Sequence, residues 1–432
     1  MKNEKLQRAK GVRDFTPQEK IARNEFEKKL RSIFELYGYN PIETPVIERY
    51  DLFASKYGLG QESDAMKETF KFKDQGKRDL VLRTEFTMPL ARFIAMNQDI
   101  RMPFKRYQIG KVFRDGPIKL GRYREFYQCD IDAVGITDNM IDAEIIECAQ
   151  TVFNELELDV VIKLNNRKLL NAILENAKIS KKDFESVIIS LDKLDKLGAK
   201  GVKSELLEKK IESQKIDQVL KLISISGTNN EIIKKLGQTL GNNAGLEEIK
   251  QTLKNLSNQK NVQFNPSLAR GLAYYTGNIF EVELKNKKQF SSSLAGGGRY
   301  DDMIAGLIGG NEIVPAIGIS FGFDAIFDAL NLKNKKNQKK TIAQVYVIAV
   351  TENERKTAFD LCAQLRKAGI KTDFDFCGRK VKRNFEYADK LEIPWVVIIG
   401  EEEVAKKIAT LRNMKTGAQE VLDLEQIVNK CK

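Results

Sequence analysis

Apolar residues near the N-terminus recur every three or four positions, whereas further along the chain they alternate with polar ones. The first pattern covers residues 19–37 and predicts an amphipathic helix that Gly38 can close. Two prolines within residues 40–48 keep the next run extended. Strand-like runs separated by turn residues then occupy residues 69–135, and they predict an antiparallel sheet.

The pattern changes again after residue 164. Residues 165–259 are rich in Leu, Ile and Lys, contain Phe184 as their one aromatic residue, and predict several short helices. Residues 331–340 are polar and basic without helical periodicity, which predicts a linker. Helix and strand patterns alternate beyond residue 341, and this alternation predicts a compact α/β domain with a largely parallel sheet.

The overall composition sets limits on partners and chemistry. A chain of 432 residues is long enough for two or three domains. Its 72 basic and 60 acidic residues give a net charge of +12, which suits a nucleic acid partner, although a lysine-rich proteome produces the same excess. The chain contains no histidine, and this excludes histidine acid–base catalysis and every metal site that needs a histidine ligand.

Cysteine usage and hydropathy bear on the compartment. The five cysteines are scattered without a CxxC pair, so neither zinc nor structural disulfides are expected and a reducing compartment fits. No apolar run approaches the length of a membrane span, and the first residues lack the apolar stretch of a signal peptide. We therefore expect a cytoplasmic protein without membrane association.

Residues 113–132 predict a β-hairpin with cationic residues at its start and tip. Two extended runs flank a loop that contains Gly116-Pro117 and Gly121. Alternation places an amide and two carboxylates on one face of the returning strand, at Gln128, Asp130 and Asp132. Carboxylates can hold an ammonium group and a guanidinium can hold a phosphate, so the hairpin suits a zwitterionic ligand beside a phosphate.

A second informative segment, residues 267–281, carries Arg270 and the pair Tyr274-Tyr275 just before a β-like run. This arrangement puts a planar guanidinium and two phenols at a strand-edge turn, where they can meet a phosphate and a polar ring. Taken alone, the segment would favour a structural turn with two packed tyrosines.

Together these segments resemble histidyl-tRNA synthetases, the class II enzymes that charge tRNA with histidine. Residues 267–281 resemble the signature loop of that family, and residues 113–132 resemble its motif 2 in the archaeal and eukaryotic form. The helix and extended run at residues 19–48 resemble motif 1, which implies a homodimer. Residues 82–92 and 296–302 resemble further substrate segments, and residues 314–327 resemble motif 3.

The resemblance implies a histidine–tRNA ligase that makes histidyl-adenylate from histidine and ATP and passes the histidyl group to histidine tRNA. It assigns the α-phosphate of ATP to Arg114 and Arg270, and places Arg122 and Arg124 near the ATP tail or the tRNA acceptor end. Mg²⁺ would enter with ATP, without zinc. The substrate residues implied are Thr84, Glu85, Phe86, Gln128, Asp132, Tyr274, Tyr275 and Tyr300.

The implied fold is an α+β catalytic domain on an antiparallel sheet with a helical insertion, followed by an α/β anticodon-binding domain. The predicted boundaries are residues 1–164 for the first catalytic part, 165–259 for the insertion, 260–330 for the second catalytic part, 331–340 for the linker and 341–432 for the anticodon-binding domain. Family expectation places the extra 5′ guanosine of histidine tRNA near residues 119–124 and the anticodon near Arg379, Lys382 and Arg383.

Two positions depart from the family pattern. Motif 3 usually carries an arginine for the γ-phosphate where this chain has Ala325, and many relatives have an acidic residue where it has Ala273. Two alternatives therefore stay open at this point: a regulatory paralogue in histidine biosynthesis, and a module that senses tRNA without making adenylate. The domain after residue 341 and the presence of Arg270 argue against the regulatory paralogue.

Overall fold

The computed structural model describes residues 6–56, 67–271, 274–287, 290–308, 313–333 and 339–432. Ala273, one of the two departures from the family pattern, lies outside these ranges, as do residues 334–338 of the predicted linker. The chain divides into two compact units, residues 1–13 with 27–334 and residues 14–26 with 335–432. Among the described helices, each is too short or too polar to cross a bilayer.

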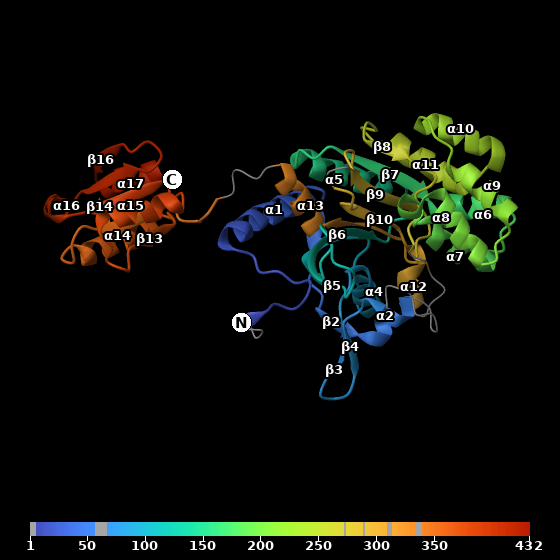
Figure 1. The fold of residues 1–432 in the computed structure, drawn as a ribbon, viewed down its shortest axis with the longest axis horizontal. Coiled ribbons are helices and arrows are strands. Elements are labelled where there is room, and N and C mark those ends of the chain that lie inside the picture. Colours follow the sequence, from blue (N-terminus) through green and yellow to red (C-terminus); the bar gives the residue numbers. More distant parts are fainter. Residues whose placement is uncertain (1–5, 57–66, 272–273, 288–289, 309–312, 334–338) are drawn as a thin grey trace. The chain divides into compact units, whose positions relative to one another are not determined.

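An eight-stranded sheet forms the centre of the first unit (Figure 1). Its internal pairs are antiparallel, and only the edge pairs β1–β5 and β7–β8 are parallel. In spatial order the strands are β1 (Asn40–Pro41), β5 (Phe104–Phe113), β6 (Glu125–Val134), β11 (Ala316–Gly322), β10 (Ala295–Arg299), β9 (Asn278–Leu284), β7 (Val160–Asn166) and β8 (Val262–Phe264).

One face of this sheet is apolar and the other is polar, because successive side chains of a strand point to opposite faces. On β6, Cys129 and Ile131 are fully buried in the apolar face. Phe321 of β11 packs there against Phe34 of α1 (Pro17–Leu36) and Phe153 of α5 (Met140–Glu155), with ring centroids 5.4 and 6.1 Å apart. The polar residues of the same two strands are left on the opposite face.

Shorter elements cover the polar face. A small antiparallel sheet precedes α4, and an apolar cluster joins Leu90 and Ile94 of α4 to Ile304 of α12. These elements are β2 (Ile47–Arg49), α2 (Tyr50–Lys56), β3 (Lys71–Lys73), β4 (Asp79–Leu82), α4 (Thr87–Met96) and α12 (Asp301–Ile308). After β11 the chain continues directly as α13 (Phe323–Lys333), so the first three residues of the predicted linker are helical.

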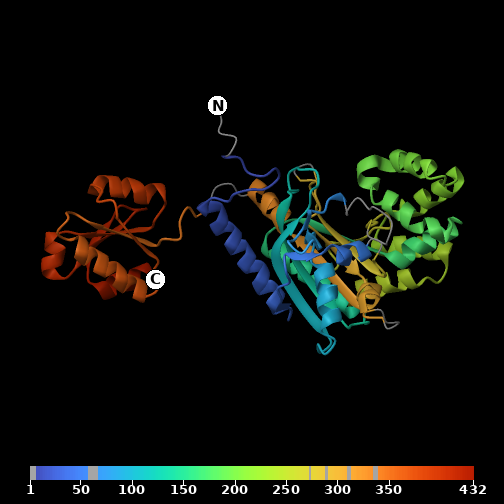
Figure 2. The same ribbon diagram turned by 90° about the horizontal axis from the view of Figure 1, so that it is seen from below.

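Between β7 and β8 the chain forms a group of helices that lies at the β7–β8 edge of the sheet (Figure 2). These helices are α6 (Arg167–Asn176), η2 (Lys181–Asp183), α7 (Phe184–Leu191), α8 (Leu194–Glu208), α9 (Ser213–Ile223), α10 (Asn229–Leu240) and α11 (Ala244–Asn255). The composition of residues 165–259, rich in Leu, Ile and Lys, is what predicted helices from the sequence.

The second unit contains a five-stranded sheet with helices on both faces. The strands β13, β12 and β14 are parallel as predicted, whereas the unpredicted strands β15 and β16 add an antiparallel hairpin. The elements are β12 (Val345–Ala349), α14 (Arg355–Lys367), β13 (Thr372–Phe374), α15 (Val381–Lys390), β14 (Trp395–Ile399), α16 (Glu401–Lys406), β15 (Ala409–Asn413), β16 (Gln419–Leu422) and α17 (Leu424–Cys431). The predicted fold class is confirmed for both parts of the chain.

Candidate active site

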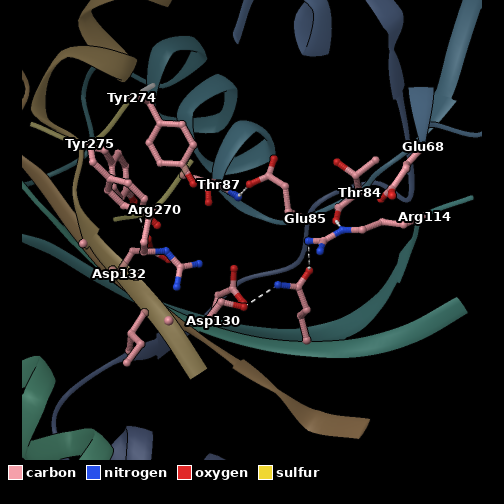
Figure 3. Close-up of a pocket in the computed structure, with 18 residues that line it drawn as sticks. Glu68, Thr84, Glu85, Thr87, Arg114, Asp130, Asp132, Arg270, Tyr274 and Tyr275 are labelled. Carbon is pink, nitrogen blue, oxygen red and sulfur yellow. Dashed lines mark hydrogen bonds between the residues drawn. The ribbon is translucent and has the colours of Figure 1, made fainter. Parts of the chain in front are cut away.

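A cavity of about 210 Å³ lies on the polar face of the large sheet. Figure 3 shows Arg114 and Arg270 on opposite sides of it, with Glu85 and Asp130 between them. It is lined by Glu68, Thr84, Glu85, Thr87, Arg114, Gln128, Asp130, Asp132, Arg270, Tyr274, Tyr275, Gly296, Gly297, Gly298, Tyr300, Gly318, Ile319 and Ser320. Nine of the twelve predicted site residues therefore come together here from segments far apart in the sequence.

Glu85 lies where β4 gives way to α4. Its carboxylate accepts hydrogen bonds from the backbone N–H groups of Thr87 at 2.7 Å and Met88 at 3.0 Å. It thus satisfies two of the free N–H groups at the start of the helix, where a negative charge is favoured. This double contact holds the carboxylate at the cavity wall, 8% exposed.

Phe86, the next residue, was predicted to contact substrate but does not line the cavity. Its ring is fully buried, with the guanidinium of Arg83 4.7 Å from the ring centroid. Its carbonyl oxygen accepts a hydrogen bond from Arg106 at 3.3 Å. Phe86 therefore supports the wall from behind.

Arg114 follows directly after β5. Its Nε donates to the carbonyl oxygen of Thr84 at 3.0 Å, and its Nη2 donates to Oε1 of Gln128 at 3.4 Å. The amide nitrogen of Gln128 in turn donates to Oγ of Ser320 at 2.5 Å. The guanidinium is therefore oriented by two oxygen acceptors.

Asp132 is a buried carboxylate of the cavity wall, 4% exposed. Its Oδ2 lies 2.7 Å from Nη2 of Arg106, which is fully buried, and its Oδ1 accepts a hydrogen bond from the hydroxyl of Tyr300. Burial raises the pKa of Asp132, and the Arg106 charge opposes that rise. A methyl group at Gly318 would lie 2.0 Å from Oδ1 of Asp132, so only glycine leaves room for this carboxylate.

Arg270 and the two tyrosines form the opposite wall. A methyl group at Gly296 would lie 1.9 Å from Nη1 of Arg270, so the guanidinium occupies space that the glycine leaves empty. Nη1 donates to the carbonyl oxygen of Phe280 at 3.4 Å. The rings of Tyr274 and Tyr275 are 4.6 Å apart, which gives a compact aromatic wall beside the guanidinium.

Tyr300 completes this wall, because its ring meets that of Tyr274 edge to face at 6.2 Å. Burial and the nearby Asp132 carboxylate raise the pKa of the Tyr300 hydroxyl well above its usual value, so the group remains a hydrogen-bond donor. The wall thus combines flat apolar surface with a fixed phenol, a combination that suits a polar ring.

Two predicted arginines, Arg122 and Arg124, do not line the cavity. Arg124 forms an ion pair with Asp115 at 2.7 Å, and its backbone N–H donates to the carbonyl oxygen of Gly11 at 2.9 Å. Arg122 lies in the exposed hairpin loop, where its backbone pairs with that of Lys119. Alternation along a strand does not predict where the side chains of a loop point. The sequence therefore did not distinguish Arg122 and Arg124 from the arginines that line the cavity.

Motif 3 is held by a residue from the N-terminal segment. Ala325 is buried on α13, and the neighbouring Asp324 accepts a hydrogen bond from Arg13 at 2.6 Å. The guanidinium of Arg13 also stacks over Tyr123 of the hairpin loop, 3.4 Å from the ring centroid. Arg13 therefore joins motif 3 to the hairpin loop.

Four polar lining side chains were not among the predicted site residues: Glu68, Thr87, Asp130 and Ser320. The strand alternation that selected Gln128 and Asp132 also selects Asp130, so that residue could have been found from sequence. Ser320 lies on β11 directly opposite Asp130 on β6, and this register exists only in the folded sheet.

Comparisons with known proteins cover both parts of the chain. The histidyl-tRNA synthetase family model matches residues 11–326, and an anticodon-binding domain model matches residues 344–432. The chain is 42% identical over 430 residues to histidine–tRNA ligase 1 of Bacillus thuringiensis subsp. konkukian, covering 98% of this chain and 99% of the relative. Histidine–tRNA ligase 2 of Shouchella clausii is also 42% identical, over 97% of this chain and 99% of the relative.

Solved structures give the same result. The crystal structure of histidyl-tRNA synthetase from Nostoc sp. PCC 7120 superposes with a TM-score of 0.83 at 29% identity, covering 99% of this chain and 98% of that one. A Bacillus halodurans structure described as an ATP phosphoribosyltransferase regulatory subunit/histidyl-tRNA synthetase has a TM-score of 0.74 over 91% of this chain and 98% of that one. At 20% identity, this second similarity concerns the fold alone.

Proposed function

Because this chain belongs to the histidyl-tRNA synthetase family, we propose that it is a histidine–tRNA ligase, as its motifs predicted. It activates histidine with ATP and transfers the histidyl group to the 3′ end of tRNA. The observation that carries this proposal is that arginines from two distant motifs flank a group of carboxylates and tyrosines in one cavity.

In the proposed first step, the histidine carboxylate attacks the α-phosphate of ATP and pyrophosphate leaves. Arg114 and Arg270 approach this phosphate from opposite walls and stabilise the negative charge that builds on it. No covalent nucleophile is needed, because positioning and charge stabilisation lower the barrier. Magnesium enters with ATP and neutralises charge on the β- and γ-phosphates.

The histidine itself is held by the carboxylates and the aromatic wall. Glu85 and Asp132 attract its ammonium group, while Tyr274, Tyr275 and Tyr300 enclose the imidazole; Thr84 and Gln128 add polar contacts. A pocket that hydrogen-bonds a ring leaves buried polar groups unpaired with other side chains, and this gives strong discrimination.

Because Ala325 replaces the usual motif 3 arginine, another cationic group must bind the γ-phosphate of ATP. We assign this role to Lys119 and Arg122 in the hairpin loop, because Arg124 is already paired with Asp115 at 2.7 Å. Burial lowers the pKa of Lys119, and the charges of Arg122 and Lys196 lower it further. An anion bound among these cations would relieve their repulsion.

We further propose that tRNA contacts the same loop with its acceptor end and the C-terminal domain with its anticodon. Arg379 donates to the hydroxyl of Tyr346 at 3.3 Å, so it is engaged within that domain. Lys382 and Arg383 are exposed beside it and are the better candidates for RNA contact. A cytoplasmic homodimer remains part of this proposal.

The first test is histidine-dependent exchange of labelled pyrophosphate into ATP, without tRNA, against a panel of other amino acids. We expect exchange with histidine alone, followed by charging of histidine tRNA. Folded protein that binds tRNA but catalyses no exchange would instead be a tRNA-sensing module, and folded protein without either property would revive the regulatory alternative.

The role of the hairpin loop has its own test. Arg122→Ala is expected to raise the KM for ATP about tenfold, the effect of losing one charge-assisted contact. Arg124→Ala serves as the comparison, since its guanidinium is bound to Asp115. If both variants keep the wild-type KM for ATP, the loop does not hold the γ-phosphate.

A further inference from the structure

Asp130 lines the cavity from β6, two residues from both Gln128 and Asp132, and Figure 3 shows it between Arg114 and Arg270. On β6 it lies opposite Ser320 of β11 on one side and Gln108 of β5 on the other. The residue is 4% exposed, so its carboxyl group is shielded from water except through the cavity.

Its carboxyl group is only partly satisfied. Oδ1 is buried and has no hydrogen-bond partner in the part of the chain that the structure describes. The hydroxyl of Ser320, directly opposite on β11, lowers the pKa of the group, which shows that it lies close to the carboxylate. A buried carboxylate oxygen without a donor is costly, and this cost is recovered when a ligand supplies the donor.

The hydrogen bonds of the neighbouring side chains set the direction in which Ser320 can donate. Nη2 of Arg114 donates to Oε1 of Gln128 at 3.4 Å, and this fixes which end of the amide faces Ser320. Nε2 of Gln128 then donates to Oγ of Ser320 at 2.5 Å. Since a hydroxyl has one hydrogen, Ser320 is left to donate it to Asp130. An ionised Asp130 therefore ends a directed chain that begins at Arg114.

Charged and titratable groups face Asp130 from three segments besides β6: the β4–α4 connection, β5 and the end of β10. They are Arg83 after β4, Glu85 before α4, Arg106 of β5 and Tyr300 after β10, together with Asp132 of β6 itself. Both arginines have other partners: Arg106 pairs with Asp132 at 2.7 Å, and Arg83 donates to the carbonyl oxygen of Thr44 at 2.6 Å.

The surroundings therefore favour a cation or a donor at this position. Burial raises the pKa of Asp130 to about 7; Asp132 and Glu85 raise it too, while Arg106 lowers it. Near neutral pH a ligand N–H group can shift the carboxyl fully to its ionised form.

We propose that Asp130 is a further binding residue of the amino-acid pocket: its Oδ1 accepts an N–H group of the bound amino acid. In the same state the carboxylate holds Ser320 and Gln128 so that Arg114 is presented to the α-phosphate. This second part rests on the proposed function, whereas the first part requires only that histidine binds. The N–H donor is either the α-ammonium group or the imidazole ring.

The test is calorimetric titration of histidine into the full-length protein at pH 6, 7 and 8, in two buffers of different ionisation enthalpy. Wild-type protein is expected to release protons on binding near pH 7. Asp130→Asn, which keeps the shape of the side chain, is expected to bind about 10- to 100-fold more weakly at pH 8, as expected for losing a charged acceptor. It should also lose the part of the proton release that Asp130 supplies.

The control is Asp328→Asn, which removes a carboxyl group outside the cavity whose pKa is likewise raised by burial. Its histidine affinity and proton release should match the wild type. The imidazole of histidine also titrates in this range and contributes to the proton release. The test therefore compares the number of protons released by the wild type with the number released by Asp130→Asn. Affinity within twofold of wild type and unchanged proton release in Asp130→Asn would overturn the proposal.

Two ligands distinguish the donors. Imidazolepropionate lacks the ammonium group, and 4-thiazolylalanine lacks a ring N–H. If the ammonium group is the donor, Asp130→Asn weakens binding of thiazolylalanine alone; if the ring is the donor, it weakens binding of imidazolepropionate alone. An undiminished affinity for both ligands would contradict the proposal.

The positioning part is tested with Ser320→Ala in pyrophosphate exchange. This variant leaves the Asp130 carboxylate in place, so the kcat of exchange should fall several-fold with less than a threefold change in histidine affinity. An unchanged kcat would refute the coupling to Arg114. If the wild type binds histidine without any exchange, the ligase proposal fails while the titrations still decide the role of Asp130.

Discussion

Two buried aspartates, one in each unit of the molecule, have opposite electrostatic behaviour. Asp130 in the catalytic cavity is 4% exposed and Asp375 after β13 is 3% exposed. Asp375 accepts hydrogen bonds from the backbone N–H groups of Cys377 at 3.0 Å and Arg379 at 2.7 Å, and from the amide of Asn384 at 2.9 Å. Burial alone would raise the pKa of Asp375, but these bonds lower it below its usual value.

The two pKa values differ because the carboxylates have different numbers of hydrogen-bond donors, and not because they are buried to different degrees. Asp375 has its donors within the protein and holds a loop together. Asp130 has one oxygen without a donor among the described residues, and its pKa is raised to about 7. A buried carboxylate with complete hydrogen bonding thus indicates a structural role, and an incomplete one facing a cavity indicates a ligand.

The largest expected effect belongs to the cavity arginines. Arg270→Ala should reduce histidine-dependent exchange by about 10²- to 10³-fold, because a preorganised cation facing the α-phosphate is lost. Arg355→Ala removes an arginine from the C-terminal unit, where it lies 5.6 Å from the Phe374 ring, and should leave exchange unchanged. Near-normal exchange by folded Arg270→Ala would remove Arg270 from the mechanism.

Alanine substitutions of glycines in the two regions should also have different effects. Gly318→Ala places a methyl group 2.0 Å from the Asp132 carboxylate and should raise the KM for histidine about tenfold or more. In Gly378→Ala the added methyl group lies 3.5 Å from its nearest neighbour, so it clashes with nothing. The variant should lose only about 1 kcal/mol of stability, because alanine is strained at a φ of 61°. Steady-state exchange kinetics separate the two, since only the first variant should change the KM.

Asp375→Asn should weaken the C-terminal unit by about 1–3 kcal/mol at pH 7, because an amide cannot accept all the bonds that the carboxylate accepts. The lowered folded-state pKa means that the carboxylate contributes stability above its unfolded pKa and loses it as pH falls through the folded value. Amide hydrogen exchange of β12 and β13 measures this difference. A loss that stays constant down to pH 3 would contradict the assignment.

Asp130→Asn should change stability in the opposite direction: it should stabilise the ligand-free protein. The folded-state pKa is about 7 and the ordinary value is 3.8, so the contribution of this group is full at low pH and is lost as pH rises through that window. At pH 8 the variant should be more stable than the ligand-free wild type by about 3 to 5 kcal/mol, and the gain should vanish near pH 4. Amide hydrogen exchange of β6 and β11, compared between the variant and the wild type at each pH, measures this gain in stability.

Most of the site was predictable because motif spacing and strand alternation are local properties. Gln128 and Asp132 follow from alternation along one strand, and Arg270 with Tyr274 follows from one short segment. Phe86 and Arg124 show the limit of this reasoning: the first faces away from the cavity beside Glu85, and the second is turned toward Asp115. Their roles in substrate binding remain predictions.

By itself, the sequence determined the family, the order of helices and strands, and the face of β6 that carries charge. Those features depend on apolar periodicity and on residues close together in the chain. Only the tertiary structure decided that Ser320 lies across from Asp130, that Gly318 leaves room for Asp132, and that Arg106 takes one side of the Asp132 carboxylate. These relations come from the register between strands far apart in sequence, and the balance of donors and acceptors around a buried group depends on all of them at once.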